Sequence, residues 1–323
     1  MPYAIRVHET GAPEVLKWEE VEVGDPGPGQ VRLRQEAIGL NYIDVYHRTG
    51  LYPQPLPFIP GVEGAGVVEA IGPSVTEVKI GDRVAYAGPI GGYAEERLID
   101  ADKLVKLPEA IAFDTAAAMM LQGMTAHMLI RSVYEVQAGD TILVHAAAGG
   151  VGLILCQWAN ALGATVIGTV STDEKAELAR AHGCDHPIVY TRQDFVAEVD
   201  RITKGAKLPV VYDSVGKDTF VKSLDCLRPR GIMVSYGNSS GPVDPFPPGI
   251  LAQKGSLFLT RPTLYNYTAS RPELEAAASE LFDVVASGKV KIEVKQRFAL
   301  KDAAEAHRAL EGRKTTGSTI LTV

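Results

Sequence analysis

The sequence predicts an α/β protein of two domains, one a partly open β-barrel and the other a doubly wound parallel sheet. The chain has 323 residues, which is more than a single hydrophobic core usually holds. Residues 1–124 contain short β-branched runs separated by Gly and Pro, a pattern typical of β-structure. From Thr125 onward strand and helix patterns alternate, as they do in proteins with a parallel sheet.

The N-terminal part is expected to form the barrel. Pairs such as Pro26-Gly27 and Gly81-Asp82 mark turns, and the candidate strands between such turns lie at 31–33, 66–71 and 83–86. The segment Tyr52–Pro60 is rich in proline, which removes backbone donors and fixes φ. This segment therefore predicts a loop.

The parallel sheet is expected to take its strands from 141–145, 165–170, 187–190, 209–213, 231–236 and 256–260. Between the first two strands, apolar residues recur at helical spacing, at Val151, Ile154, Leu155, Trp158 and Leu162. Beyond Pro262 we expect a helix over 271–286, a strand over 291–298, a helix over 301–310 and a strand over 318–323. Because this tail follows a complete α/β unit, we expect it to return to the barrel. The predicted domains are 1–124 with 263–323, and 125–262.

Composition excludes several classes of protein. The net charge of −7 argues against a dedicated nucleic-acid binder, whose affinity rests on neutralising phosphates. Three cysteines without C-x-x-C spacing indicate neither a disulfide framework nor a zinc ribbon. No apolar run approaches the ~18 residues of a membrane span. The N-terminal residues lack a basic segment followed by an apolar one, so we expect a cytoplasmic protein.

The strongest chemical signal is the loop Ala146–Gly152, which directly follows a predicted strand and opens a predicted helix. A dinucleotide pyrophosphate needs backbone N–H donors at a helix N-terminus and glycines that allow the chain to come close. The loop is a variant of G-x-G-x-x-G in which alanine replaces the first glycine. A tight turn alone would also use these glycines, but the strand before the loop and the helix after it favour a dinucleotide.

The end of the second strand of this sheet indicates which dinucleotide binds. NAD sites place an acid there for the ribose 2′-hydroxyl, whereas this chain has Ser171, with Lys175 one helical turn later. Tyr190 ends the third strand. A hydroxyl, an ammonium and a phenol suit a 2′-phosphate, so NADPH is favoured. Two alternatives stay open: Ser171 and Lys175 could be an N-cap and a solvated helix residue, or a shifted register could bring Asp173 or Glu174 to the ribose.

Similarity to a known family extends over the whole chain, and it is carried by 11–16, 37–44, 50–52, 61–66, 144–152, 211–216, 234–241 and 260–262. In these stretches the chain resembles the quinone oxidoreductase (zeta-crystallin-like) family of the medium-chain dehydrogenase/reductase superfamily. The resemblance implies a GroES-like catalytic domain, a Rossmann domain inserted into it, NADPH as the cofactor and a cleft between the two domains.

The resemblance also implies roles for particular residues. Asn41, Tyr46 and Tyr52 should face the nicotinamide and the substrate, and Gln122 and Thr125 should lie near the nicotinamide ribose. The pyrophosphate should be held by Gly149, Gly150 and Val151, and the 2′-phosphate by Ser171, Lys175 and Tyr190. The middle of the cofactor groove should be lined by Val215, Tyr236, Gly237, Asn238 and Ser239. The residues expected to close over the cofactor are Leu259, Thr260, Arg261, Pro262 and Arg313.

No metal site is expected. Zinc-dependent members of the superfamily carry a Cys and a Gly-His-Glu triplet where this chain has Asn41 and Gly61-Val62-Glu63. Zinc needs three or four converging N, S or O ligands, which Asn and Val do not supply. Glu63 is either a ligand remnant or a hydrogen-bonded charged residue. A quinone or enone is already electrophilic and needs mainly positioning and hydrogen bonds to the developing oxyanion. Asn41, Tyr46 and Tyr52 could donate these bonds, or the tyrosines could only shape the site.

These observations lead to an NADPH:quinone oxidoreductase without metal. Within the enzymes, the alternative is an NADPH-dependent alkenal or enone reductase. From another class, some zeta-crystallin-like relatives bind AU-rich RNA, which the acidic balance disfavours. A homodimer is also expected, because the apolar strand at 255–261 should form an exposed sheet edge that a second copy could cover.

Overall fold

The computed structural model describes all residues from Met1 to Val323 and confirms the α/β fold class. The chain forms two compact units. The barrel unit comprises Met1–Met124, Thr268–Ala286 and Ile292–Val323, and the sheet unit comprises Thr125–Tyr267 and Ser287–Lys291. The functional domain boundaries after residues 124 and 262 stay a prediction. None of the helices combines the length and the apolar character needed to cross a bilayer.

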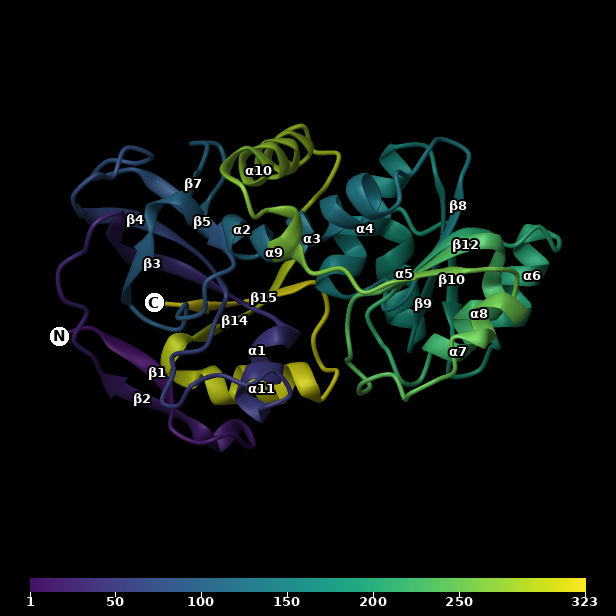
Figure 1. Ribbon diagram of the computed structural model, residues 1–323, viewed down its shortest axis with the longest axis horizontal. Coiled ribbons are helices and arrows are strands. Elements are labelled where there is room, and N and C mark those ends of the chain that lie inside the picture. Colours follow the sequence, from purple (N-terminus) through teal and green to yellow (C-terminus); the bar gives the residue numbers. More distant parts are fainter. The chain divides into compact units, whose positions relative to one another are not determined.

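The barrel unit is built around the long strand β3 (Gln30–Leu40). It pairs antiparallel with β4 (Glu63–Ile71), β6 (Glu96–Asp100) and β15 (Ser318–Thr322). The sheet continues through β5 (Arg83–Ala87) and β7 (Val105–Lys106) on one side and β14 (Val294–Ala299) on the other. The C-terminal strands thus return to the barrel, as the sequence predicted (Figure 1).

Strand β3 is much longer than the predicted strand at 31–33, and the polar run Arg34-Gln35-Glu36 in its middle explains the difference. Val31 and Leu33 point into a core that they share with Val68 and Ile99. Further along, Gln35 is also buried, because its amide nitrogen donates to the carbonyl oxygens of Gly92 and Ala94 at 2.5 and 2.6 Å. A buried glutamine that a loop satisfies interrupts the apolar pattern by which strands are recognised.

Helices and a hairpin complete the barrel unit. Helix α1 (Tyr42–Thr49), which the sequence interpretation did not identify, follows β3 directly, and the predicted loop Tyr52–Pro60 comes after it. Helix α10 (Arg271–Ala286) has the predicted bounds. The unit also contains β1 (Tyr3–Val7), β2 (Leu16–Glu20), α2 (Phe113–Ala117), α3 (Met120–His127), which runs into the sheet unit, and α11 (Ala303–Glu311).

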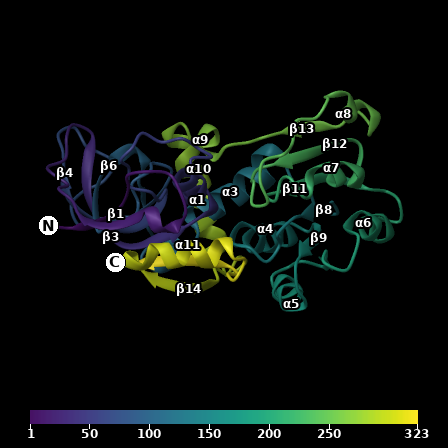
Figure 2. The same cartoon turned by 90° about the horizontal axis from the view of Figure 1, so that it is seen from below.

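The sheet unit contains a six-stranded parallel sheet in the order β10-β9-β8-β11-β12-β13. Its strands are β8 (Thr141–Val144), β9 (Thr165–Val170), β10 (His186–Val189), β11 (Leu208–Asp213), β12 (Leu227–Ser235) and β13 (Phe258–Thr260). Figure 2 shows these strands surrounded by the helices α4 (Gly150–Ala161), α5 (Asp173–Ala181), α6 (Phe195–Thr203), α7 (Phe220–Ser223) and α8 (Gly249–Gln253). The strand order reverses between β8 and β11, which is the switch point where doubly wound sheets bind ligands.

Candidate functional site

Asn41 lies at the junction between β3 and α1 and is almost completely buried. Its Nδ2 donates to Oε2 of Glu63 at 2.6 Å, and its Oδ1 accepts from Nε2 of Gln122 at 3.1 Å. Its backbone N–H donates to Oδ2 of Asp44 at 2.9 Å. Side chain and backbone are therefore held separately, and the orientation of the amide is fixed by its two partners.

The hydrogen-bond network around Asn41 draws on four elements of the barrel unit. Glu63 begins β4, and its Oε1 accepts from the backbone N–H of Leu121 at 2.8 Å. Gln122 lies in α3, and its Oε1 is 2.7 Å from Oγ of Ser318, at the start of β15. Ser318 was not identified from the sequence, because only the pairing of β15 with β3 brings it here.

A glycine in β3 makes room for the Glu63 carboxylate. A Cβ atom built on Gly39 would lie 2.2 Å from Oε2 of Glu63 and 2.3 Å from the carbonyl oxygen of Ala117. The second of these atoms belongs to the backbone and cannot move aside cheaply. Gly39 therefore provides the space in which the buried acid meets Asn41.

The two buried acids of this site have raised pKa values. Burial raises the pKa of Glu63 to about 8, against the hydrogen bonds from Asn41 and Leu121 and with a smaller contribution from the like charge of Asp44. Burial likewise raises the pKa of Asp44 to about 7, although donors from Asn41 and Tyr93 oppose the shift. Near neutral pH the network therefore carries less negative charge than two ordinary carboxylates would.

The two candidate tyrosines pack together beside Asn41. Tyr46 lies in α1 and Tyr52 follows that helix, and their ring centroids are 5.1 Å apart in an edge-to-face arrangement. The backbone N–H of Tyr52 donates to the carbonyl oxygen of Tyr46 at 3.0 Å. Tyr42 extends the group, with its ring centroid 6.1 Å from that of Tyr46. Asn41, Tyr46 and Tyr52 thus come from one short segment of the chain.

In the sheet unit, the glycine loop joins β8 to α4 at the switch point of the parallel sheet. Gly149 is the N-cap of α4, and the helix begins at Gly150 and Val151. A Cβ on Gly152 would lie 2.3 Å from the carbonyl oxygen of Ala146, and Ala146 itself has a φ of 53°. The turn therefore needs glycine for close backbone approach, and it presents the N-terminus of a 12-residue helix.

His145, which precedes this loop, is part of the packing rather than of the chemistry. Its Nδ1 lies 2.9 Å from Oγ1 of Thr169, and its Nε2 lies 2.8 Å from Oγ of Ser223. Burial lowers its pKa. Both ring nitrogens are thus occupied inside the sheet unit.

The residues expected at the 2′-phosphate gather where β9 and β10 end. Ser171 follows β9, and Thr172, not Ser171, is the N-cap of α5, accepting from the backbone N–H of Lys175 at 3.3 Å. Tyr190 follows β10 and is 40% exposed. Asp173 is paired with Arg192, whose NH1 donates to Oδ2 of Asp173 at 2.7 Å. The sequence interpretation missed Arg192, although a cation that neutralises Asp173 bears on which nucleotide is accepted.

The remaining candidates of the sheet unit follow the carboxyl ends of β11, β12 and β13. The backbone N–H of Val215 donates to Oδ1 of Asp213 at 2.8 Å. NH1 of Arg261 donates to the carbonyl oxygens of Ser235 and Gly237 at 3.1 and 3.0 Å, which brings the ends of β12 and β13 together. Tyr236, Asn238 and Ser239 follow β12, Leu259 and Thr260 lie in β13, and Pro262 comes after it.

The candidate residues are divided between the two units. Thr125 belongs to the sheet unit, whereas Gln122 precedes it in the barrel unit. Arg313 belongs to the barrel unit, where it follows α11 with a φ of 56°.

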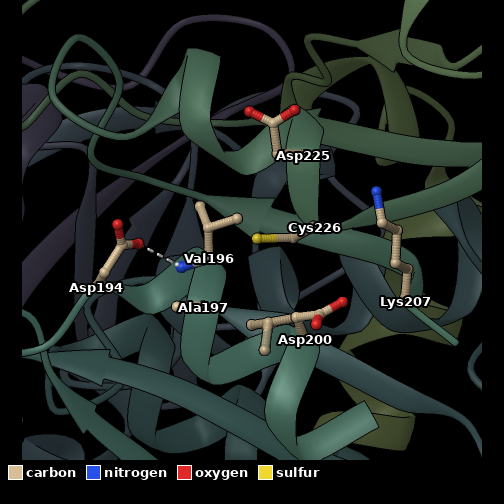
Figure 3. Close-up of a pocket in the computed structure, with 8 residues that line it drawn as sticks. Asp194, Val196, Ala197, Asp200, Lys207, Asp225 and Cys226 are labelled. Atoms are coloured by element: carbon tan, nitrogen blue, oxygen red, sulfur yellow. Dashed lines mark hydrogen bonds between the residues drawn. The ribbon is translucent and has the colours of Figure 1, made fainter. Parts of the chain in front are cut away.

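A pocket of about 320 Å³ elsewhere in the sheet unit contains none of these candidates (Figure 3). It lies around α6 and is lined by Asp194, Val196, Ala197, Val199, Asp200, Lys207, Asp225 and Cys226. The Asp194 carboxylate is used as the N-cap of α6, accepting from the backbone N–H of Val196 at 2.9 Å. Burial raises the pKa of the Cys226 thiol to about 12, so it is not a reactive thiolate.

Comparisons with known proteins agree over almost the whole chain. The alcohol dehydrogenase GroES-like domain matches residues 27–109, and the zinc-binding dehydrogenase model matches residues 150–283. A quinone oxidoreductase of Pseudomonas aeruginosa is 56% identical over 313 residues, covering 96% of each chain. A 2-haloacrylate reductase of a Burkholderia species is 50% identical over 330 residues, covering 99% of each. The crystal structure of Escherichia coli quinone oxidoreductase with NADPH is 49% identical, with a TM-score of 0.98 over 99% of this chain and 100% of that one.

The raised pKa of Glu63 predicts a pH-dependent stability. Between the ordinary carboxyl pKa and about 8, the folded protein keeps a proton that the unfolded chain has lost, so raising the pH destabilises the folded state by up to about 1.4 kcal/mol per unit. Thermal unfolding of Glu63→Gln should show a smaller decrease in Tm between pH 5.5 and 8 than the wild type does. The exposed Glu20→Gln serves as the control. Equal decreases in all three proteins would show that folding does not raise the pKa of Glu63.

Proposed function

The chain belongs to the quinone oxidoreductase family of the medium-chain dehydrogenases/reductases, and from this we propose that it is an enzyme that reduces quinones with NADPH. The observation that carries this proposal is the near-complete match to an NADPH complex of a quinone oxidoreductase, combined with a glycine loop at the switch point of the parallel sheet.

The residues of the sheet unit fit NADPH. Gly149, Gly150 and Val151 present backbone donors at the N-terminus of α4, where the pyrophosphate would be held. We propose Ser171, Lys175 and Tyr190 for the 2′-phosphate. Of the two acids that could compete for that position, Asp173 is paired with Arg192, and Glu174 stays an alternative. When bound, NADPH supplies the hydride for the reduction.

In the barrel unit, we propose Asn41 as the main hydrogen-bond donor to the reacting carbonyl. An amide nitrogen carries two hydrogens, and the bond to Glu63 uses one of them. The other can stabilise the oxyanion that develops when a quinone accepts a hydride. Tyr46 and Tyr52 either donate further bonds or only shape the site. Phenylalanine substitutions distinguish these roles, because only the loss of a donor lowers kcat, by roughly ten-fold.

We also propose that the reaction needs no catalytic metal. Asn41 and Val62 stand where zinc-dependent relatives carry ligands, and both amide atoms of Asn41 are engaged by Glu63 and Gln122. Val62 is fully buried and offers no ligand atom. In the whole structure, no three or more His, Cys, Asp or Glu side chains are grouped as metal ligands would be.

A second candidate activity is the reduction of an activated carbon–carbon double bond. A 2-haloacrylate reductase is 50% identical to this chain over 99% of its length, nearly as similar as the quinone oxidoreductases. The same donors would serve a conjugated carbonyl or carboxylate.

The cytoplasm stays the predicted location.

We further propose a homodimer that pairs through β13. This strand is at the edge of the parallel sheet and pairs only with β12. Its side chains Phe258 and Leu259 are 60% and 37% exposed. Such an edge is a pairing liability unless it is covered, and two-fold pairing would cover it in both copies.

Activity assays test the proposed function directly. With NADPH, the purified protein should reduce 1,4-benzoquinone and 9,10-phenanthrenequinone with a higher kcat/KM than a 2-alkenal or 2-haloacrylate, because the quinones need only positioning and oxyanion stabilisation. A chelator should leave the rates unchanged. Preference for the activated alkenes would establish the second candidate activity. About one zinc per chain with chelator-sensitive activity would refute the proposal of a metal-free reaction.

Lys175 should carry much of the preference for NADPH. An ammonium–phosphate contact is worth roughly 1.5–3 kcal/mol, so Lys175→Ala should raise the KM for NADPH on the order of ten- to a hundred-fold at low salt. The KM for NADH should scarcely change, because NADH lacks the phosphate. Lys222→Ala, which removes an exposed lysine of α7, is the control. Parallel losses with NADH and NADPH would place the 2′-phosphate elsewhere.

Light scattering at micromolar concentration should give the mass of a dimer for the wild type. Phe258→Glu should give a monomer, because it places a charge on the exposed face of β13. The exposed Val221→Glu in α7 is the matched control and should stay dimeric. A monomeric wild type would contradict the proposed pairing.

A further inference from the structure

A series of hydrogen-bonded, buried side chains in the barrel unit ends at the backbone of Asn41. Oδ2 of Asp44 accepts from the Asn41 N–H at 2.9 Å and from the Tyr93 hydroxyl at 3.0 Å. The same hydroxyl lies 3.1 Å from Nε2 of His307 in α11. The side chains of Asp44, Tyr93 and His307 are completely buried.

The far end of this series is anchored by an ion pair. NH1 of Arg48 lies 3.1 Å from Nδ1 of His307, and the guanidinium also donates to both carboxylate oxygens of Glu311 at 2.9 and 2.8 Å. The Arg48 side chain is 1% exposed, whereas that of Glu311 is 34% exposed. Only this last member reaches the surface. We call Asp44, Tyr93, His307, Arg48 and Glu311 the Asn41 relay.

The chemistry of arginine fixes the direction of every hydrogen bond in this relay. A guanidinium can only donate, so Nδ1 of His307 must accept. The proton of the neutral imidazole is then on Nε2, which donates to the Tyr93 oxygen, and the Tyr93 O–H is left to donate to Asp44. Burial, together with the charge of Arg48, lowers the pKa of His307 to about 3, in agreement with a neutral ring.

Asp44 depends on two donors, the Asn41 N–H and the Tyr93 hydroxyl, for its orientation. Its Oδ1 is buried and has no hydrogen-bond partner, so only the two bonds to Oδ2 hold the carboxylate. The titratable groups that interact electrostatically with Asp44 are Tyr93 of the relay, Glu63 as a like charge and Tyr86, while Arg48 acts on Tyr93. Without the Tyr93 hydroxyl, the Asn41 N–H would be the only donor to Asp44.

We propose that Tyr93 and His307 are positioning residues for the reaction, which hold Asp44 against the Asn41 N–H and thereby fix the backbone position from which the Asn41 side chain, oriented by Glu63 and Gln122, meets the substrate. The proposal rests on the proposed function, in which Asn41 donates to the reacting carbonyl. Both residues lie far from Asn41 in sequence. The proposal also requires that His307 carries its proton on Nε2.

Tyr93→Phe removes one hydroxyl of the relay, and Tyr86→Phe is its matched control. Tyr86 is a fully buried tyrosine of the same unit, and its hydroxyl donates to Oε1 of Gln35, outside the relay. Tyr93→Phe should lower kcat for a quinone about ten-fold, with the KM for NADPH unchanged. The hydrogen bond from Tyr93 lowers the pKa of Asp44, so its loss should raise that pKa. The acidic limb of the kcat–pH profile, which we expect to report the ionisation of Asp44, should therefore move to higher pH. Tyr86→Phe should alter neither quantity, even if both variants lose similar stability. Equal kcat values and pH profiles in the two variants would overturn the proposal.

A second experiment does not use activity. In ¹⁵N-histidine NMR of the full chain, His307 should show an unprotonated Nδ1 and a protonated Nε2, with no titration between pH 5 and 8. His307→Gln, which can offer an amide N–H to Tyr93 and an oxygen to Arg48, should restore most of the kcat that His307→Leu loses. An imidazolium, the Nδ1–H tautomer, or equal kcat in the Gln and Leu variants would overturn the relay. A wild type with the expected NMR signature but no quinone reduction would instead refute the proposed function.

Discussion

The candidate active site depends on the bond between the Asn41 amide and the buried Glu63 carboxyl. It is 2.6 Å long and lies in the space left by Gly39. It directs the Nδ2 atom of Asn41 toward Glu63. Burial raises the pKa of Glu63 to about 8, so near neutral pH the acid is largely protonated. A neutral partner matters, because a buried negative charge beside Asn41 would oppose the oxyanion that the amide is proposed to stabilise.

The proposed cofactor site depends on a different physical feature, which is backbone geometry. The parallel sheet reverses its strand order between β8 and β11, and the glycine loop lies at the end of β8. Backbone N–H groups at the start of α4 can hold a pyrophosphate whatever the side chains are, whereas we propose that side chains after β9 and β10 select the nucleotide. Arg192 pairs with Asp173, so this acid can lie near the ends of β9 and β10 with less repulsion of a phosphate.

Local patterns were sufficient for much of the fold and for only part of the site. The α/β class, the six parallel strands and the bounds of α10 could be predicted, because apolar periodicity and Gly and Pro turns are local signals. The extension of β3 could not, since the run Arg34-Gln35-Glu36 with its buried glutamine breaks the apolar pattern. Helix α1 and the N-cap at Thr172 were not predicted either. Asp44 carried an overlooked local signal, as the acid three residues after an N-cap asparagine. Ser318 and His307 carried none, because they reach the network only through β15 and α11.

The central claim is that the Asn41 amide donates to the reacting carbonyl in an NADPH-dependent reduction. The most direct test is single-turnover reduction of 1,4-benzoquinone by Asn41→Ala saturated with NADPH, alongside NADPH binding followed by fluorescence. The account predicts a rate of hydride transfer lower by about a hundred-fold or more, with a nearly unchanged Kd for NADPH. A folded Asn41→Ala protein that reduces the quinone at the wild-type rate would contradict it.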